Sequence, residues 1–293
     1  MSPVSPGGQG PTAPPARSPV TFEELAALPD ERLDVATGAA LIARDAYPRI
    51  DPVTLLARLD AIAAPLAAGG IGALAPREQA RRVSEHLYDA LGFRGNEGDY
   101  YDPRNSFLPD VLDRKLGIPI SLALVYCEIA RRAGVRARGV GFPGHFLVRV
   151  DGPDGDDEPH AVDPFHGGRL LGRPELQALL HRAAPTQKLD PAQHLVPATA
   201  RATLVRMLIN LKWVYTTRGD LARALLALDR IILLSPDSTA ALRERGLLAA
   251  RLGSVEGARA DLSRLLELAP EAPDAESIRR QLTELRGKSS VLN

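Results

Sequence analysis

The chain has 293 residues, enough for two domains at about 150 residues per domain. Its 36 basic and 36 acidic residues give a formal net charge of zero, so no broad basic field points to nucleic acid or an anionic membrane as a partner. The single cysteine excludes an internal disulfide framework and a cysteine-rich metal module, and it fits a reducing compartment.

The first twenty residues, MSPVSPGGQGPTAPPARSPV, are rich in Pro, Gly and Ser. We expect a disordered tail, because the segment cannot bury enough apolar surface to offset the entropy of ordering. It resembles neither a signal peptide nor a membrane anchor. No later apolar run reaches membrane-spanning length without a charge, so the sequence predicts a cytoplasmic protein with no membrane partner.

Residues 21–93 are predicted to be helical. Apolar residues recur at spacings of three and four in LDVATGAALIARDAYP. Asp51 supplies an N-cap and Pro52 a proline at the first helical position, and the helix that they begin is predicted to stop at Gly69. Another helix is predicted over 76–93.

Residues 94–109 are predicted to form a loop, because Gly-Asn and Asp-Pro pairs are turn signals. A loop of this length that carries several aromatic residues is often functional. The aromatics can equally cap a hydrophobic core, and both interpretations stay open. Tyr100, Tyr101 and Asn105 are the candidate binding residues, for a peptide or a modified side chain.

The most apolar helix is predicted over ISLALVYCEIARRAG, as the central helix of its domain. A reactive thiol is usually activated at a helix N-terminus, whereas Cys127 lies about two turns inside the helix. The sequence therefore predicts a buried, inert cysteine. Ser121, at the start of the helix, is either a cap or a nucleophile, and its chemistry alone favours the cap.

Extended segments follow: VRARGVGF, HFLVRV and, after a Gly/Asp-rich turn, HAVDPF. An antiparallel hairpin centred on residue 154 would bring His145 close to Asp163, since directly opposed Cβ atoms lie about 5 Å apart. A histidine oriented by an aspartate can act as a general base. With Ser121 the pair would form a Ser-His-Asp arrangement.

A metal site is the competing interpretation of the same segment. Four side chains offer ligands for a divalent ion: His145, His160, Asp163 and His166. However, the chain has no HExxH or similarly specific spacing, and His160 and Asp163 would point to opposite faces of a strand. The sequence therefore predicts no metal and no cofactor.

The C-terminal part contains an internal repeat. The segments 203–236 and 237–270 align, and Pro236 and Pro270, which close them, are 34 residues apart. This period, with the order helix, small-residue turn, helix and proline, is that of the tetratricopeptide repeat. Two repeats with a capping helix make a small array, which we expect to depend on the first domain for stability.

These motifs resemble the SirB1 family of bacterial proteins, over about residues 22–285: GNEGDYYDPRNSFLPDVLDRKLGIPISLALVYCEIARRAGV, GFPGHFLVRV and VDPFHGG, then RMLINLKWVY and RERGLL. The resemblance implies an α+β, papain-like transglutaminase core followed by tetratricopeptide helices. In active members of the wider superfamily a cysteine opens the central helix, a histidine lies on the next strand and an aspartate follows in an Asp-Pro element. His145 and Asp163 match the last two.

The helix-opening position falls near residues 119–121, where there is no cysteine. This departure argues against cysteine-based acyl transfer. The favoured interpretation is therefore a scaffold without the standard activity, which binds a protein or peptide partner through its repeats and binds no nucleic acid. The alternative is an amide or ester hydrolase or acyltransferase that uses Ser121, His145 and Asp163.

The predicted domain organisation follows from these assignments. Its segments are a tail 1–20, a transglutaminase-like domain 21–185 with a helical part 21–93 and a core 94–185, a linker 186–202, a tetratricopeptide domain 203–287 and a tail 288–293.

Overall fold

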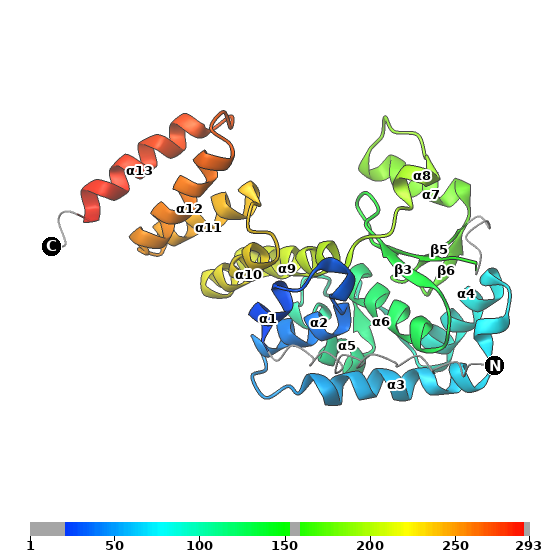
Figure 1. Ribbon diagram of the computed structural model, residues 1–293. Helices are drawn as coiled ribbons and strands as arrows, with labels where there is room; N and C mark the ends of the chain where they lie inside the picture. The colour runs from blue at the N-terminus through cyan, green and yellow to red at the C-terminus, as the bar shows by residue number, and fades with distance from the viewer. Residues whose placement is uncertain (1–20, 153–158, 290–293) are drawn as a thin grey trace, which may run out of the picture.

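The computed structural model describes residues 21–152 and 159–289. The predicted tail 1–20 and most of the turn predicted at 151–158 lie outside these residues. An α+β body is followed by a helical arm that projects from one side of it (Figure 1). The predicted fold class, a mixed core followed by all-helical repeats, is confirmed.

The N-terminal part is helical, as predicted. Its elements are α1 (Phe22–Ala26), α2 (Val35–Arg44), α3 (Pro52–Ala68) and α4 (Pro76–Ser84). The Asp51 carboxylate caps α3 by accepting hydrogen bonds from the backbone N–H groups of Val53 and Thr54. The helix predicted over 76–93 changes form at its end, because residues Glu85–Ala90 make a π-helical turn.

The segment 94–109, predicted to be a loop, begins with the short strand β1 (Arg94–Gly95) and contains a 3-10 turn at Pro103–Asn105. It ends in the first residues of α5 (Leu108–Arg114). β1 pairs in parallel with β2 (Leu116–Gly117). α5 ends at Arg114, because Lys115 adopts a left-handed conformation with a φ of 57°.

α6 (Pro119–Arg132) runs through the middle of the body and packs against α3 and the sheet (Figure 1). Its side chains from Pro119 to Ala130 are buried, apart from that of Cys127. Tyr126 is fully buried, and its hydroxyl donates a 2.8 Å hydrogen bond to the carbonyl of Ala80. The prediction of a central helix is therefore confirmed.

The sheet is an antiparallel meander in the order β3-β4-β5-β6. Its strands are β3 (Ala137–Val140), β4 (Leu147–Val150), β5 (His160–Asp163) and β6 (Arg169–Leu171). Val148 lies opposite Val162, which centres the predicted hairpin on residue 155 instead of 154. Alternate residues face opposite sides: Val148 packs into the core around α6, whereas Leu147 packs under α7 (Arg173–Ala183).

The repeats form five antiparallel helices after a short α8 (Pro191–His194), which lies within the predicted linker. They are α9 (Ala200–Thr217), α10 (Leu221–Leu234), α11 (Thr239–Arg251), α12 (Val255–Leu268) and α13 (Ala275–Ser289). Within the described part of the chain, no helix is both long and apolar enough to cross a membrane.

The first repeat belongs to the core of the body, whereas the second has a core of its own. Buried residues of α9 and α10 join the cluster around α6, and those of α11 and α12 join α13. A Cβ added to Gly38 of α2 would lie 2.5 Å from a methyl group of Leu204, so glycine permits the close approach of α2 and α9. The shared core of the first repeat agrees with the expectation that the array depends on the first domain for stability, which stays a prediction.

Candidate functional site

Three polar side chains meet at the end of β5. The Asp163 side chain is fully buried, and its two carboxylate oxygens face two different histidines. Nε2 of His145 lies 2.9 Å from Oδ1, and Nδ1 of His166 lies 2.7 Å from Oδ2. The predicted closeness of His145 and Asp163 is confirmed, and His166 joins them as a third member.

The turn after β5 fixes the position of Asp163. Its Oδ1 accepts hydrogen bonds from the backbone N–H groups of Phe165 (3.1 Å) and His166 (3.2 Å). The chain then folds back, and the Gly168 N–H donates a 2.9 Å hydrogen bond to the Asp163 carbonyl. From α4, the Ser84 hydroxyl donates a 2.7 Å hydrogen bond to the Gly168 carbonyl. The backbone of the turn thus holds the carboxylate, and Ser84 of α4 holds the turn.

The two histidines differ in exposure. The His145 side chain is 11% exposed and that of His166 is 42% exposed. His145 lies in the turn between β3 and β4, where its N–H donates a 3.0 Å hydrogen bond to the carbonyl of Phe142. The edge of the Phe165 ring contacts both imidazoles. The cluster therefore opens to solvent on the side of His166.

The charge of Asp163 is stabilised by its neighbours. Burial alone would raise its pKa, but hydrogen bonds and charge from His145 and then His166 outweigh burial and hold the pKa well below its usual range. The nearest other cation is the guanidinium of Arg169, 3.9 Å from Oδ2. Asp163 is therefore ionised at neutral pH, and it can orient an imidazole or balance a positive charge.

Ser121, the predicted nucleophile, is engaged elsewhere. Its side chain is buried, and its hydroxyl lies 2.6 Å from the Asn105 carbonyl and 3.1 Å from that of Ile118. Among residues 21–152 and 159–289, no hydrogen bond joins Ser121 to His145. The hydroxyl proton is donated to a carbonyl, so the Ser-His-Asp arrangement does not form. Ser121 instead holds the start of α6.

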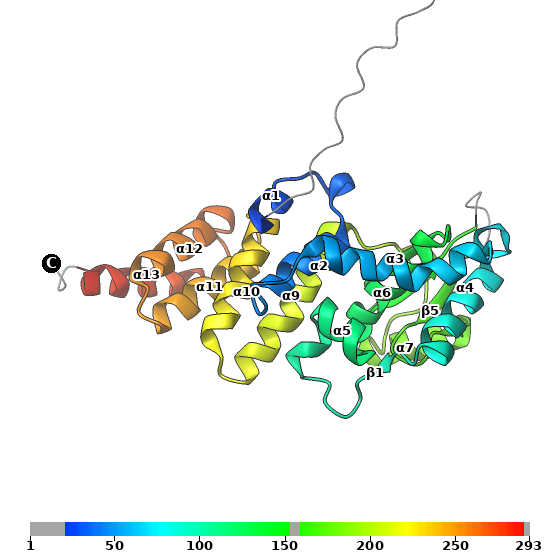
Figure 2. The ribbon, with the colours of Figure 1, turned by 90° about the horizontal axis from the view of Figure 1, so that it is seen from below.

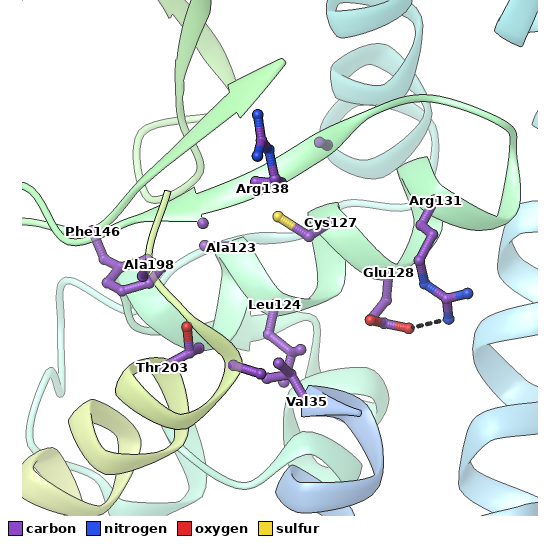
Figure 3. A pocket seen from close by; sticks show the side chains of 13 residues that line it. Val35, Ala123, Leu124, Cys127, Glu128, Arg131, Arg138, Phe146, Ala198 and Thr203 are labelled. Carbon is purple, nitrogen blue, oxygen red and sulfur yellow. Dashed lines mark hydrogen bonds and ion pairs between the residues drawn. The ribbon is translucent and has the colours of Figure 1, made fainter. Parts of the chain in front are cut away.

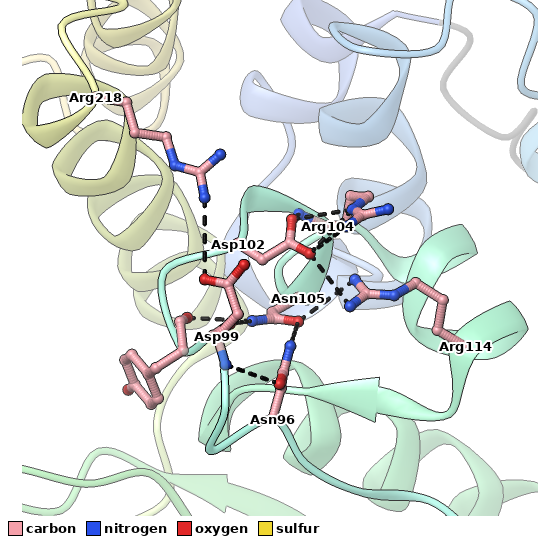
Figure 4. Close-up of polar contacts among 8 residues, drawn as sticks. Asn96, Asp99, Asp102, Arg104, Asn105, Arg114 and Arg218 are labelled. Atoms are coloured by element: carbon pink, nitrogen blue, oxygen red, sulfur yellow. Dashed lines mark hydrogen bonds and ion pairs between the residues drawn. The ribbon is translucent and has the colours of Figure 1, made fainter.

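Asn105, predicted to bind a ligand, is fully buried. Its amide donates to the carbonyls of Asp99 (2.7 Å) and Tyr100 (3.1 Å), and it accepts a 2.9 Å hydrogen bond from Asn96 (Figure 4). This prediction needs correction, because a side chain whose polar atoms all bind the loop cannot reach a ligand. Asn105 shapes the loop that presents Tyr100.

A buried carboxylate completes this cluster beneath the loop. Asp102 is 5% exposed and pairs with Arg104 at 2.8 Å and Arg114 at 3.2 Å (Figure 4). Burial would raise its pKa, but the hydrogen bonds and charges of the two arginines outweigh burial and lower it. The inner side of the loop is therefore a closed polar cluster of Asn96, Asp102, Asn105 and Ser121.

The outer side of the loop is aromatic and reaches the repeats. Tyr100 is 41% and Tyr101 50% exposed, and the Tyr101 ring centroid lies 4.5 Å from that of Trp213 on α9. Tyr100 packs edge-on against Phe165 beside the histidines, at 5.8 Å. Figure 2 shows this loop, between β1 and α5, beside α9. The exposed rings of Tyr100, Tyr101 and Trp213 form an aromatic surface across both parts of the chain, and the buried ring of Phe165 lies behind Tyr100.

Charges accompany the aromatic surface. Arg218 of the first repeat lies 4.0 Å from Asp99 of the loop (Figure 4). Arg206 is exposed and lies on the same face of α9 as Trp213. Burial raises the pKa of Tyr100, and the charge of Arg206 opposes this rise. Arg206 forms no ion pair with another residue that the structure describes. Trp213 is not among the residues predicted from the sequence; the one signal for it is its position as a large apolar residue off the core face of α9.

Cys127 lies on the wall of a cavity of about 170 Å³ between α6, β3 and the start of α9 (Figure 3). Its neighbours on that wall include Glu128, Arg138, Phe146 and Thr203. Desolvation, followed by the charge of Glu128, raises the pKa of its thiol. The cysteine predicted to be buried and inert is only partly buried, and its raised pKa agrees with an unreactive thiol.

Comparison with known proteins identifies the family. Residues 54–209 match the transglutaminase-like superfamily, and residues 211–283 match a tetratricopeptide repeat family. A UPF0162 protein of Xylella fastidiosa is 41% identical over 268 residues, which are 90% of this chain and 94% of that protein. The chain belongs to the UPF0162, or SirB1-like, family. A UPF0162 protein of Pseudomonas aeruginosa is 33% identical over 86% of this chain and 91% of its own length.

Another relative is similar to this chain over only about a third of its length. Human F-box only protein 21 is 41% identical over 99 residues, which are 32% of this chain and 16% of that protein. The resemblance to the SirB1 family is thus confirmed, and so is the succession of a transglutaminase-like domain and tetratricopeptide repeats. The transglutaminase-like match ends at residue 209, inside α9, which agrees with the shared core of the body and the first repeat.

Proposed function

We propose that this UPF0162 protein is a cytoplasmic scaffold that binds an extended segment of a partner protein, without transglutaminase chemistry. One observation carries the proposal: the contact of Tyr101 with Trp213, which joins the loop and the first repeat into one exposed surface. Tetratricopeptide repeats generally mediate protein–protein interaction. Exposed aromatic rings are the side chains that most often dominate such interfaces.

The face of α9 supports this surface. Ile209 is 41% and Trp213 44% exposed, although both are large and apolar. They are four residues apart and therefore adjacent on one side of the helix. Together with the two tyrosines they offer a broad apolar patch, and contiguous exposed patches of this kind mark interaction sites.

The charge near the patch favours an acidic partner. Arg206 has no ion-pair partner among the described residues, and Arg169 beside the histidines is half exposed. Arg206, whose charge acts on Tyr100, borders the aromatic surface. We therefore expect the bound segment to place an apolar or aromatic side chain next to Trp213 and an acidic side chain within reach of Arg206.

The first turn of α6 argues against the standard transglutaminase activity. Pro119 begins α6, and Ser121 gives its hydroxyl proton to a buried carbonyl. Neither side chain supplies an activated nucleophile. The alternative of a hydrolase or acyltransferase retains only the His145–Asp163 pair in its favour.

The experiment is a selection of random peptides displayed on phage against the full chain. We expect enriched peptides that combine aromatic and acidic residues. Substituting Trp213→Ala or Tyr101→Ala should weaken their binding, measured by fluorescence anisotropy, at least tenfold, which corresponds to about 1.4 kcal/mol. Arg206→Glu should weaken acidic peptides most.

Leu252→Ala is the matched control, because Leu252 is 47% exposed in the second repeat but lies outside the aromatic surface. It should leave binding unchanged. Peptides that bind the Trp213→Ala and Tyr101→Ala variants as tightly as the natural chain would contradict the proposal.

A further inference from the structure

We propose that His145, Asp163 and His166 form a binding site for a divalent transition metal of the Zn²⁺ class. One ligand atom from each residue lies within 4.8 Å of the other two. Two imidazoles and one carboxylate are a common set for Zn²⁺ in sites that keep a further position open for water or another ligand. This inference is independent of the scaffold function proposed above.

The distances suit a bound ion. The histidine nitrogens lie 2.9 Å and 2.7 Å from the two oxygens of Asp163. Ligands that bind Zn²⁺ at about 2.0–2.2 Å are themselves separated by about 3 Å. A metal can therefore replace the shared hydrogen atoms if the two imidazoles move towards each other, because the three ligand atoms are now spread over up to 4.8 Å.

The charge of the site favours a cation. The Asp163 carboxyl group is fully buried, yet its closest partners are two imidazoles and two backbone N–H groups. Buried charges are normally paired or coordinate metals. The only guanidinium within 4 Å among the described residues is that of Arg169, whose side chain is 53% exposed and lies at 3.9 Å. An ion between the three ligands would neutralise the carboxylate directly.

The ligands are held by a fixed outer shell. The backbone of the turn after β5 orients the carboxylate, and Ser84 ties that turn to α4. Hydrogen bonds behind the ligands are a regular feature of metal sites. His166 is 42% exposed, which gives an ion and a water molecule access to the site.

Sequence spacing could not reveal this site. Its ligands come from the turn between β3 and β4, from the last residue of β5 and from the turn after β5, so they form no continuous motif. The prediction of no metal weighed His160 as a fourth ligand. His160 lies at the opposite end of β5 from Asp163 and outside the cluster.

The test uses the full chain without a histidine tag, stripped with a chelator and then titrated with Zn²⁺ by calorimetry. We expect one ion per chain, and we expect Co²⁺ to give visible absorption bands that Zn²⁺ abolishes. His145→Ala and His166→Ala should each weaken binding at least about 100-fold, because loss of a ligand exceeds the loss caused by outer-shell changes. His160→Ala, on the same strand, should bind like the natural chain.

Thermal unfolding supplies a second measurement. Zn²⁺ should raise the midpoint of the natural chain and of His160→Ala, but not that of His166→Ala. The exposed position of His166 makes a folded variant the expected result. The proposal is overturned by the absence of saturable binding, by binding that survives in both ligand variants, or by an equal loss in His160→Ala.

Discussion

Two polar clusters of this protein each contain one buried aspartate, but the aspartates have different partners. The closed cluster beneath the loop, Asn96, Asp102, Asn105 and Ser121, satisfies its hydrogen bonds internally. The open cluster, His145, Asp163 and His166, surrounds one buried carboxylate with imidazoles that reach the surface. The difference teaches that partners separate the two buried carboxylates: arginines hold Asp102, whereas two imidazoles, one of them 42% exposed, hold Asp163.

The loop 94–109 connects the two clusters. The closed cluster fixes its inner side, and the fixed loop presents Tyr100 and Tyr101 towards α9 and Phe165. If this division holds, substitutions in the closed cluster reduce stability, whereas substitutions on the aromatic surface reduce binding alone.

The largest effect is expected for Asn105→Ala. The change removes the hydrogen bonds that this fully buried side chain makes with the carbonyls of Asp99 and Tyr100 and with the amide of Asn96. We expect a loss of about 3 kcal/mol in the free energy of unfolding, measured with urea. A loss below about 0.5 kcal/mol would show that the loop does not depend on the closed cluster.

The next effect is that of Asp102→Asn, with a loss of about 2 kcal/mol at neutral pH. The pKa of Asp102 is lowered in the folded chain, so its contribution is present above the unfolded pKa of about 3.9. That contribution is lost as the pH falls through the folded pKa. Urea unfolding of both chains from pH 7 to pH 3 should show a difference that shrinks below about pH 4.

An unchanged difference between the Asp102→Asn variant and the natural chain across this range would mean that the charge of Asp102 is not what stabilises the loop. Asp113→Asn is the control, because this carboxylate is 65% exposed in its ion pair with Arg58. It should cost well below about 1 kcal/mol.

A smaller effect is expected for Ser121→Ala, about 1 kcal/mol, because the hydroxyl links Asn105 to the start of α6. The reactivity of Ser121 also tests the alternative interpretation, a hydrolase or acyltransferase with Ser121 as its nucleophile. We expect a fluorophosphonate probe to leave Ser121 unlabelled, as judged by mass spectrometry of the intact protein. Labelling of Ser121 would show that its hydroxyl is nucleophilic, and it would contradict the structural role assigned to this residue.

The smallest effect on stability is expected for Trp213→Ala, below about 0.5 kcal/mol, because the ring is 44% exposed. The same variant should nevertheless lose peptide binding at least tenfold, about 1.4 kcal/mol. A large drop in its unfolding midpoint would instead make Trp213 part of the structural contact between loop and repeat.

The sequence by itself determined the local elements. Helix caps, apolar spacing and the 34-residue period placed α3, α6 and the repeats, because these signals lie in neighbouring residues. Hairpin symmetry placed His145 close to Asp163, although the observed register differs by two residues from the predicted one. The absence of a cysteine at the start of α6 was also readable directly.

Only the tertiary structure decided what distant segments do for one another. It turned Asn105 and Ser121 inward, added His166 to the histidine pair, and set Tyr101 against Trp213. It also merged the first repeat with the body while the second kept its own core. The physical reason is that a side chain's partners and exposure depend on segments up to more than a hundred residues away, which no local period encodes.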